Sequence, residues 1–219
     1  IYDTKYGKTF YSSLGNHDCY GDESKQWTCA IDKWRMDAEQ WTFTKPNDKT
    51  SNQIVEFFII NSEFWSGGNS AGEQWLDNAL TASTAKWKVF VAHHPLCSIG
   101  EHGDGGSSYI QAVMSAAKGR FDVYLTGHDH DWSYLKCSKN DRSGKAYNLE
   151  HFVIGTGGAG LRTDTPDSRT VSWCASNSST DCNGFGKIDV TSNEFRVRFF
   201  DYGKQKGNNV PYYETKFFK

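Results

Sequence analysis

Candidate metal ligands follow three short apolar runs of this 219-residue chain. The three sets are Gly15-Asn16-His17-Asp18, His93-His94 and Gly127-His128-Asp129-His130. The runs before them, residues 10–14, 87–92 and 121–126, contain the β-branched and aromatic side chains that are typical of buried strands. Ligands of open α/β sheets bind beyond the carboxyl ends of the strands, so we expect the three sets to share one crevice.

The residue types in these sets favour a catalytic metal centre. Asn16, His93, His128 and His130 offer three imidazoles and one amide oxygen, which suit borderline divalent or trivalent ions. Closed structural zinc sites usually include cysteine, and this set has none. One histidine alone is more often an ordinary surface or core residue, but three motifs at three strand ends favour the metal.

Three other features have simpler interpretations. His94 is adjacent to His93, and neighbouring residues of a strand point to opposite faces, so we expect a supporting or structural role rather than a substrate contact. His151 is expected to be an ordinary surface or strand histidine. Residues 155–160 are glycine-rich like a dinucleotide fingerprint, but no helix pattern follows, and we expect a tight loop beside the site.

The elements that must position these residues alternate between strand and helix. The strands expected in this part of the chain are 54–61, 87–92 and 121–126, and the expected amphipathic helices are 71–83 and 107–118. Their alternation predicts βαβ units with right-handed crossovers. A further short helix is expected around residues 31–40.

The last part of the chain changes to an antiparallel style. Residues 132–137 and 149–154 flank a turn and predict a hairpin. The same pattern recurs at residues 184–190, 194–201 and 212–218. The expected fold class is therefore α/β with mixed sheets.

Length and charge exclude several classes of protein. The chain fits one domain, or most of one, and can bury a core. Its 24 Lys and Arg residues against 26 Asp and Glu residues form no long block of one sign, so we expect no nucleic-acid partner. No apolar run reaches the roughly 20 residues of a membrane span, and no signal peptide opens the chain. Because the chain starts at Ile1, we expect a processed or incomplete form of a longer protein.

Six cysteines and one glycosylation sequon favour an oxidising compartment. No pair has the C-x-x-C spacing of a zinc or redox motif, so disulfides are the better interpretation. Short loops suit the pairs Cys19 with Cys29 and Cys174 with Cys182, which leaves Cys97 and Cys137. The connectivity stays open at this point, because six cysteines allow fifteen pairings. The sequon is Asn177-Ser178-Ser179.

The motifs together resemble the calcineurin-like metallophosphoesterases, and more narrowly the small purple, tartrate-resistant type, acid phosphatases. The resemblance includes Cys97-Ser98-Ile99-Gly100-Glu101-His102-Gly103 and extends to Asn183-Gly184-Phe185-Gly186. It implies a metallo-dependent phosphatase-like, four-layer αββα sandwich with mixed sheets. Residues 1–219 would be the C-terminal two-thirds of that domain.

The resemblance also implies a role for each site residue. Asn16, His93 and His128 would bind an exchangeable divalent metal, and His130 would bind a ferric ion. The implied cofactor is a dinuclear centre of Fe with a second Fe, Zn or Mn ion. The implied catalytic residues, which face the phosphate and the leaving group, are His17 and His102. Asp18 and Asp129 are expected to orient the neighbouring histidines.

The chain lacks two ligand-bearing segments of the family, and two interpretations of this difference stay open. An Asp-x-His segment and a Gly-Asp-x-x-Tyr segment, which carry further ligands in the family, have no counterpart before Gly15. The chain is then either part of a larger protein or a non-catalytic relative. We expect the first, because a protein freed from catalysis has no chemical reason to keep the later ligands.

The resulting functional hypothesis is an acid phosphatase-like enzyme that is secreted, extracellular or lysosomal. It would hydrolyse small phosphate esters or phosphoproteins with a two-metal centre. Expected partners are the missing N-terminal segment or other extracellular chains, without nucleic acid or membrane insertion. The alternative is a non-catalytic extracellular structural or interaction protein that reuses the fold.

Overall fold

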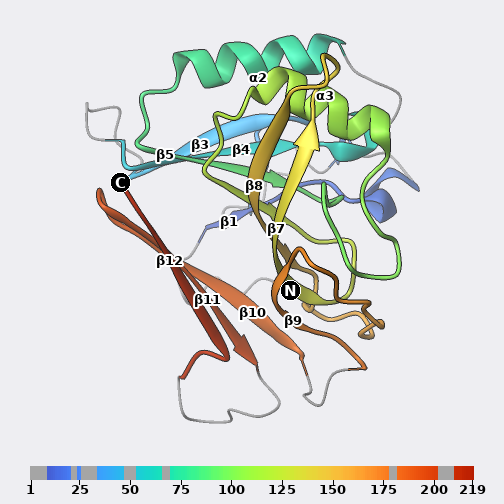
Figure 1. Cartoon of the computed structure of the whole chain (residues 1–219). Helices are drawn as coiled ribbons and strands as arrows, with labels where there is room; N and C mark the ends of the chain where they lie inside the picture. The colour runs from blue at the N-terminus through green and yellow to red at the C-terminus, as the bar shows by residue number, and fades with distance from the viewer. Residues whose placement is uncertain are drawn as a thin grey trace.

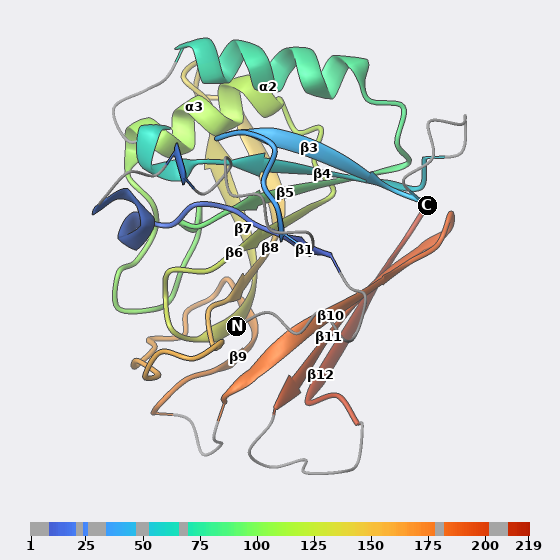
Figure 2. The same cartoon turned by 180° about the vertical axis from the view of Figure 1, so that it is seen from behind.

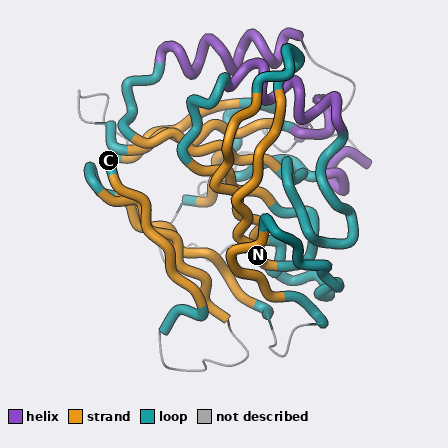
Figure 3. Tube along the Cα trace, in the orientation of Figure 1, coloured by secondary structure: helices purple, strands orange, loops and turns teal. Residues whose placement is uncertain are grey.

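The computed structural model describes residues 9–20, 24–25, 34–46, 53–65, 70–177, 182–201 and 210–219. In these ranges a seven-stranded mixed sheet lies between a layer of two helices and a three-stranded sheet (Figures 1 and 2). The helices are α2 (Ser70–Ala82) and α3 (Ser107–Ala117). Both lie on one face of the large sheet, as the tube view also shows (Figure 3). The fold is α/β with mixed sheets, as predicted, and these layers form an α, β, β stack.

The large sheet has the strand order β3-β4-β5-β6-β8-β7-β9. Its strands are β3 (Trp41–Lys45), β4 (Val55–Ile60), β5 (Trp87–Ala92), β6 (Val123–Thr126), β7 (Trp132–Asn140), β8 (Ala146–Ile154) and β9 (Thr170–Cys174). The four strands β4, β5, β6 and β8 are parallel, so their carboxyl ends lie at one edge of the sheet. The predicted βαβ units and the β7–β8 hairpin are confirmed.

The small sheet is an antiparallel meander of β10 (Gly184–Val190), β11 (Glu194–Asp201) and β12 (Tyr213–Phe218). A separate parallel pair joins β1 (Phe10–Tyr11) to β2 (Trp34–Arg35). Two short 3-10 helices, Asn16–Tyr20 and Ser62–Trp65, follow β1 and β4 along the chain.

Strand β5 is apolar except at Lys88, because it is covered on both faces. Trp87 and Val89 belong to the core between the two sheets. Phe90 and Ala92 belong to the core under α2 and α3. A parallel strand that is covered on both faces needs apolar side chains at both alternating sets of positions. The strand is thereby held rigidly and presents the residues that follow it in a defined direction.

The helix predicted around residues 31–40 is wrong for the part of it that lies within the described ranges. Trp34 and Arg35 pair with β1, and Trp41 starts β3 opposite Ile59. Trp41 is buried there at 4% exposure, so burial and strand pairing override the local helix signal. Residues 31–33 lie outside the described residues.

Two disulfides are formed within the described residues. They are Cys97–Cys137, which spans 40 residues, and Cys174–Cys182, which spans 8. Cys29 lies outside the described ranges, so its predicted pairing with Cys19 stays a prediction. Neither α2 nor α3, nor any other helix in the described parts of the chain, is long and apolar enough to cross a membrane.

Candidate metal centre

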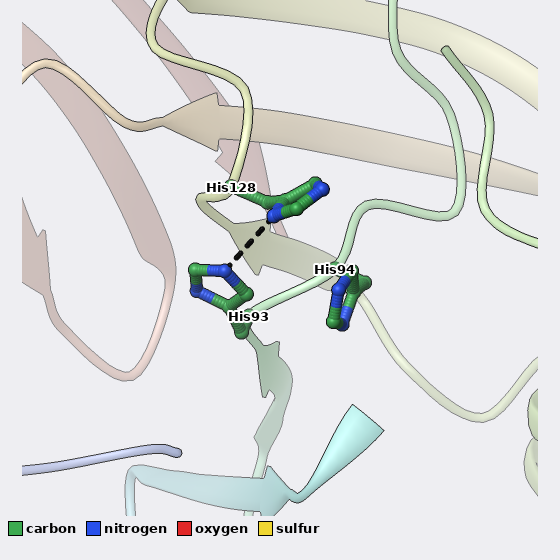
Figure 4. Close-up of side chains that lie close together, drawn as sticks. All are labelled: His93, His94 and His128. Carbon is green, nitrogen blue, oxygen red and sulfur yellow. Dashed lines mark hydrogen bonds between the residues drawn. The ribbon is translucent and has the colours of Figure 1, made fainter. Parts of the chain in front are cut away.

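The carboxyl ends of the parallel strands deliver the polar side chains of the site. His93 and His94 follow β5, and His128 follows β6. Figure 4 shows the three rings gathered at this edge, with the rings of His93 and His128 turned toward each other. Within the described ranges, these three histidines form the one group of His, Cys, Asp or Glu that is close enough to share an ion, with ligand atoms within 4.8 Å of one another.

Asn16, His93 and His128 converge on one point. The Nε2 atom of His93 lies 2.8 Å from Oδ1 of Asn16 and 3.0 Å from Nδ1 of His128. Burial, reinforced by the neighbouring imidazoles, lowers the pKa of His93 to about 3 and that of His128 to about 4. Both rings are therefore neutral above about pH 5, as metal binding requires. The predicted divalent-metal ligands are together in space.

The backbone at Gly15 and at His128 has the geometry that brings the three ligands together. A Cβ atom added to Gly15 would lie 2.8 Å from Nδ1 of His93, so only glycine lets the Asn16 backbone approach the ring this closely. His128 has a φ of 69°, a left-handed conformation that is costly for a residue other than glycine. Strain at His128 indicates that its side chain is held there for its chemistry.

His94 joins the cluster instead of pointing away from it. Its ring centroid is 4.4 Å from that of His128, because the chain bends after Ala92 and the strand alternation stops. Its Nδ1 atom is 2.8 Å from the Ser62 hydroxyl, and its Nε2 atom is 3.6 Å from a carboxylate oxygen of Glu63. Both nitrogens thus face protein groups, and His94 would bind a metal only after releasing one of them.

A pocket of about 100 Å³ opens beside His94. Its other lining residues are Ser62, Glu63, Gly105, Gly106 and Tyr109. The space lies next to the histidine cluster and is large enough for a small group attached to a metal-bound anion.

His102 stands over the cluster at the end of its loop. Its ring centroid lies 4.3 Å from that of His128, at an interplanar angle of 30°. The backbone N–H of His102 donates to Asp129 Oδ1 at 3.0 Å, and the Ser98 hydroxyl donates to Oδ2 of the same carboxylate. Asp129 is fully buried, and these two hydrogen bonds hold the loop that carries His102. We predicted instead that Asp129 orients a neighbouring histidine ring.

His130 lies apart from the three-histidine group. Its Nδ1 atom is 2.9 Å from the carbonyl oxygen of Gly160 and must donate to it, because a carbonyl only accepts. The lone pair is then on Nε2, which is the usual arrangement of a metal-binding histidine. The loop at residues 155–160 lies beside the site, as predicted.

His17 and Asp18 lie in the 3-10 helix Asn16–Tyr20, and both are exposed. Positive charge on His17 would lower the pKa of His93, so the two rings are within electrostatic reach. Asp18 accepts the backbone N–H of Gly15 at 2.8 Å and thereby shapes the turn that carries Asn16. Its contact is with the backbone, whereas we predicted one with a histidine ring.

The donor set fits a divalent transition metal. Two neutral imidazoles and an amide oxygen meet at one point, and a third imidazole is adjacent. For a second ion the described residues provide His130, with its lone pair on Nε2.

Arg162, Ser62 and Glu63 were not predicted from the sequence to lie at the site. His94 was predicted to point away from His93 and not to join the cluster. Ser62 and Glu63 follow β4, and Arg162 lies in the loop after β8. The rule that predicted the histidine sets, namely that polar residues after a buried strand meet at one edge, would have selected Ser62 and Glu63 too, whereas Arg162 lies well beyond the end of β8.

Comparison with known proteins identifies related chains. A family model described as calcineurin-like phosphoesterase matches residues 2–132, which is more than half of the chain. Purple acid phosphatase 4 of Arabidopsis thaliana is 26% identical over 235 residues, covering 95% of this chain and 62% of the relative. Purple acid phosphatase 17 of the same plant is 27% identical and covers 56% and 41%. Tartrate-resistant acid phosphatase type 5 of Homo sapiens is 27% identical and covers 64% and 47%.

A solved structure described as GAP50, the anchor in the inner membrane complex of Plasmodium, has a similar fold. Its TM-score is 0.68 at 18% identity, with 96% of this chain and 66% of that chain covered. This chain spans about half the length of the curated relatives it matches, from 41% to 62% for the three named above.

Proposed function

Since this chain belongs to the calcineurin-like phosphoesterase family, we propose that it hydrolyses phosphate monoesters at a metal centre held by Asn16, His93 and His128. The observation that carries the proposal is the meeting of one amide oxygen and two imidazole nitrogens within 2.8 and 3.0 Å, both rings being neutral. Purple acid phosphatases among its relatives support a monoester as the substrate.

The family implies a dinuclear centre, and we propose iron with a second Fe, Zn or Mn ion. Bound metal ions of this kind polarise phosphoryl oxygens and activate water for in-line attack. His130 would hold the iron through Nε2, because its Nδ1–H donates a hydrogen bond to the carbonyl oxygen of Gly160. Metal analysis of the protein made from its complete coding sequence tests this assignment: we expect about two transition-metal ions per chain, one of them iron, and zinc alone would contradict it.

His102 and His17 would act on the substrate rather than on the metal. The His102 ring lies against that of His128, where it can approach a phosphate bound at the metal centre. His94 and the pocket beside it would receive the leaving group. A positioned imidazole that protonates the leaving oxygen typically contributes roughly 10²–10⁴-fold to the rate.

The His102→Ala variant tests this assignment. Both p-nitrophenyl phosphate and an alkyl phosphate would be assayed, with metal content measured on the same samples. We expect the metals to stay and the alkyl phosphate to suffer the larger loss, since p-nitrophenolate leaves without needing a proton. Equal losses on both substrates would make His102 a phosphate-binding residue and pass the acid role to His17. Loss of metal would contradict the assignment of the whole loop.

The alternative is a protein without turnover that reuses the fold for assembly. A neighbour described as an anchor is compatible with it, although 18% identity indicates a common fold alone. The presence of the later ligands, Asn16, His93, His128 and His130, favours the enzyme. Absence of metal-dependent hydrolysis by a protein that binds its metals would favour the alternative.

An oxidising compartment agrees with the two disulfides, and we propose a secreted, extracellular or lysosomal protein. Its substrates would be small phosphate esters or phosphoproteins, and its partners would be other extracellular chains. Release of the protein into the medium or into lysosomes, followed with a fluorescent fusion, tests the location.

A further inference from the structure

Arg162 is fixed at the mouth of the metal centre by its backbone. Its N–H donates to the carbonyl of His130 at 3.2 Å, and its own carbonyl accepts the N–H of Ser176 at 2.8 Å. The loop that carries it is further held by the N–H of Thr165, which donates to Ile99 at 2.9 Å in the loop that carries His102. The guanidinium group therefore starts from a defined position between the two loops.

The Arg162 side chain reaches over the histidines. Its Nη1 atom contacts Nε2 of His102, and its Nε atom is 3.7 Å from a carboxylate oxygen of Glu101. The side chain is 33% exposed, so part of it is accessible to a ligand. Its charge also lowers the pKa of His128, which places it within electrostatic reach of the metal ligands.

The charge on Arg162 differs in kind from that of the rings around it. A guanidinium is always charged, whereas an imidazole binds a metal in its neutral form. Its planar fork of N–H donors matches two oxygens of a phosphate at once. Arg162 is thus a permanent cation with phosphate-matching geometry at the edge of the histidine cluster.

We propose that Arg162 binds the non-bridging oxygens of the substrate phosphoryl group, exchanging its contacts with Glu101 and His102 for them. The inference rests on the proposed function, because it names the residue that recognises the phosphate at that site. In the free protein the Glu101 carboxylate stands in for the anion. The ion pair is exposed and separated by 3.7 Å, so its loss costs little.

The exchange has a consequence for His102. A guanidinium only donates hydrogen bonds, so its contact uses the lone pair of His102 Nε2. When Arg162 turns to the phosphate, Nε2 is released from this contact and can face the substrate. Phosphate binding would in this way prepare His102 for its proposed role.

The test measures binding of inorganic phosphate to the metal-loaded protein by calorimetry, together with KM, kcat and metal content. The variants are Arg162→Ala, Arg162→Lys and Glu101→Gln. The matched control is Arg142→Ala, which removes an arginine whose exposed ion pair with Glu73 joins a β-turn to α2 away from the site. We expect Arg162→Ala to weaken phosphate binding by about 10-fold or more, as for loss of a charge-assisted hydrogen bond.

Arg162→Lys should bind phosphate with intermediate affinity, because a lysine keeps the charge and loses the fork. Glu101→Gln should bind it a few-fold more tightly, and the control should match the wild type. Metal content should be unchanged in all four variants. Wild-type affinity for phosphate in a folded, metal-loaded Arg162→Ala protein would overturn the inference, as would a wild-type protein that binds no phosphate. Tight phosphate binding that depends on Arg162 without ester hydrolysis would support the inference and refute the proposed function.

Discussion

Replacement of Asp129 by asparagine should separate the loop that carries His102 from the metal ligands. Asp129 is fully buried and accepts two hydrogen bonds, one from the Ser98 hydroxyl and one from the His102 backbone N–H. An asparagine can still accept the His102 N–H with its oxygen. Its NH₂ group then faces the Ser98 hydroxyl, which already accepts the N–H of Gly100 at 3.0 Å.

The expected cost follows from these contacts. Hydrogen bonds to a charged group contribute about 1.5–3 kcal/mol each, and Asp129→Asn weakens one and removes the charge from both. We expect the free energy of unfolding to fall by about 3 kcal/mol. Misplacement of a reacting group by 1 Å can cost about 10²-fold in rate, so kcat should fall by a similar factor as His102 shifts.

The assay combines denaturant unfolding, metal content and kcat on the same preparation. Asp141→Asn is the matched control, because Asp141 also accepts a serine hydroxyl and two backbone N–H groups, but in the exposed β7–β8 turn. That variant should keep wild-type kcat. Metal content of Asp129→Asn should also be normal, since its two hydrogen bonds involve no metal ligand. A folded Asp129→Asn protein that has lost its metal, or that keeps full kcat, would refute this reasoning.

Three further predictions concern backbone strain, acid stability and covalent structure. His128→Gly should raise the free energy of unfolding of the metal-free protein by about 1 kcal/mol, because glycine accepts a φ of 69° without strain. Lys118→Gly, at a φ of 52° outside the site, should have the same effect. A destabilised His128→Gly protein would contradict the presence of strain at this position. Burial lowers the pKa of His151 to about 3, so below pH 6.5 the unfolded state binds a proton that the folded state excludes. Stability should therefore fall by up to about 1.4 kcal/mol per pH unit as the pH drops from 6.5 toward 3; pH-dependent unfolding of His151→Gln should show a shallower slope, and an identical slope would rule this group out. The Cys97→Ala, Cys137→Ala double variant should lose about 4 kcal/mol in denaturant unfolding, since the bond spans 40 residues; a loss below about 1 kcal/mol would show that the unfolded chain is not constrained by it.

The sequence allowed the parallel core and the principal metal ligands to be predicted, because both depend on local patterns. An apolar run such as that of β5 predicts a buried strand, and the polar residues after it are expected at the edge of the sheet where the carboxyl ends of the strands lie. The meeting of His93 and His128 follows from this rule, whereas Asn16 follows β1, which pairs with β2 outside the large sheet. The helix predicted around residues 31–40 is wrong for residues 34–40, because the pairing of Trp34 with Phe10 is a long-range contact that no local pattern contains.

The position of His94 was misjudged for a related reason. Alternation was applied past the last residue of the strand, whereas the chain bends after Ala92 and turns the ring back to His128. Arg162 reaches His102 across 60 residues of sequence through two loops, and only the folded structure brings them together. His151, expected to be a surface or strand histidine, is fully buried in β8 and accepts the N–H of Leu96.

We propose that His93 and His128, with Asn16, hold the metal at which this protein hydrolyses phosphate esters. The most direct measurement follows phosphate release from p-nitrophenyl phosphate against bound metal, in the wild type and in His128→Gly, with Lys118→Gly as the control. Loss of a group that merely supports a metal ligand typically costs about 10–100-fold in affinity, so loss of the ligand itself should cost at least about 100-fold. We expect release to rise with bound metal in the wild type and the control, and His128→Gly to bind little metal and release little phosphate while remaining folded. Equal metal binding and equal release by His128→Gly would contradict the account.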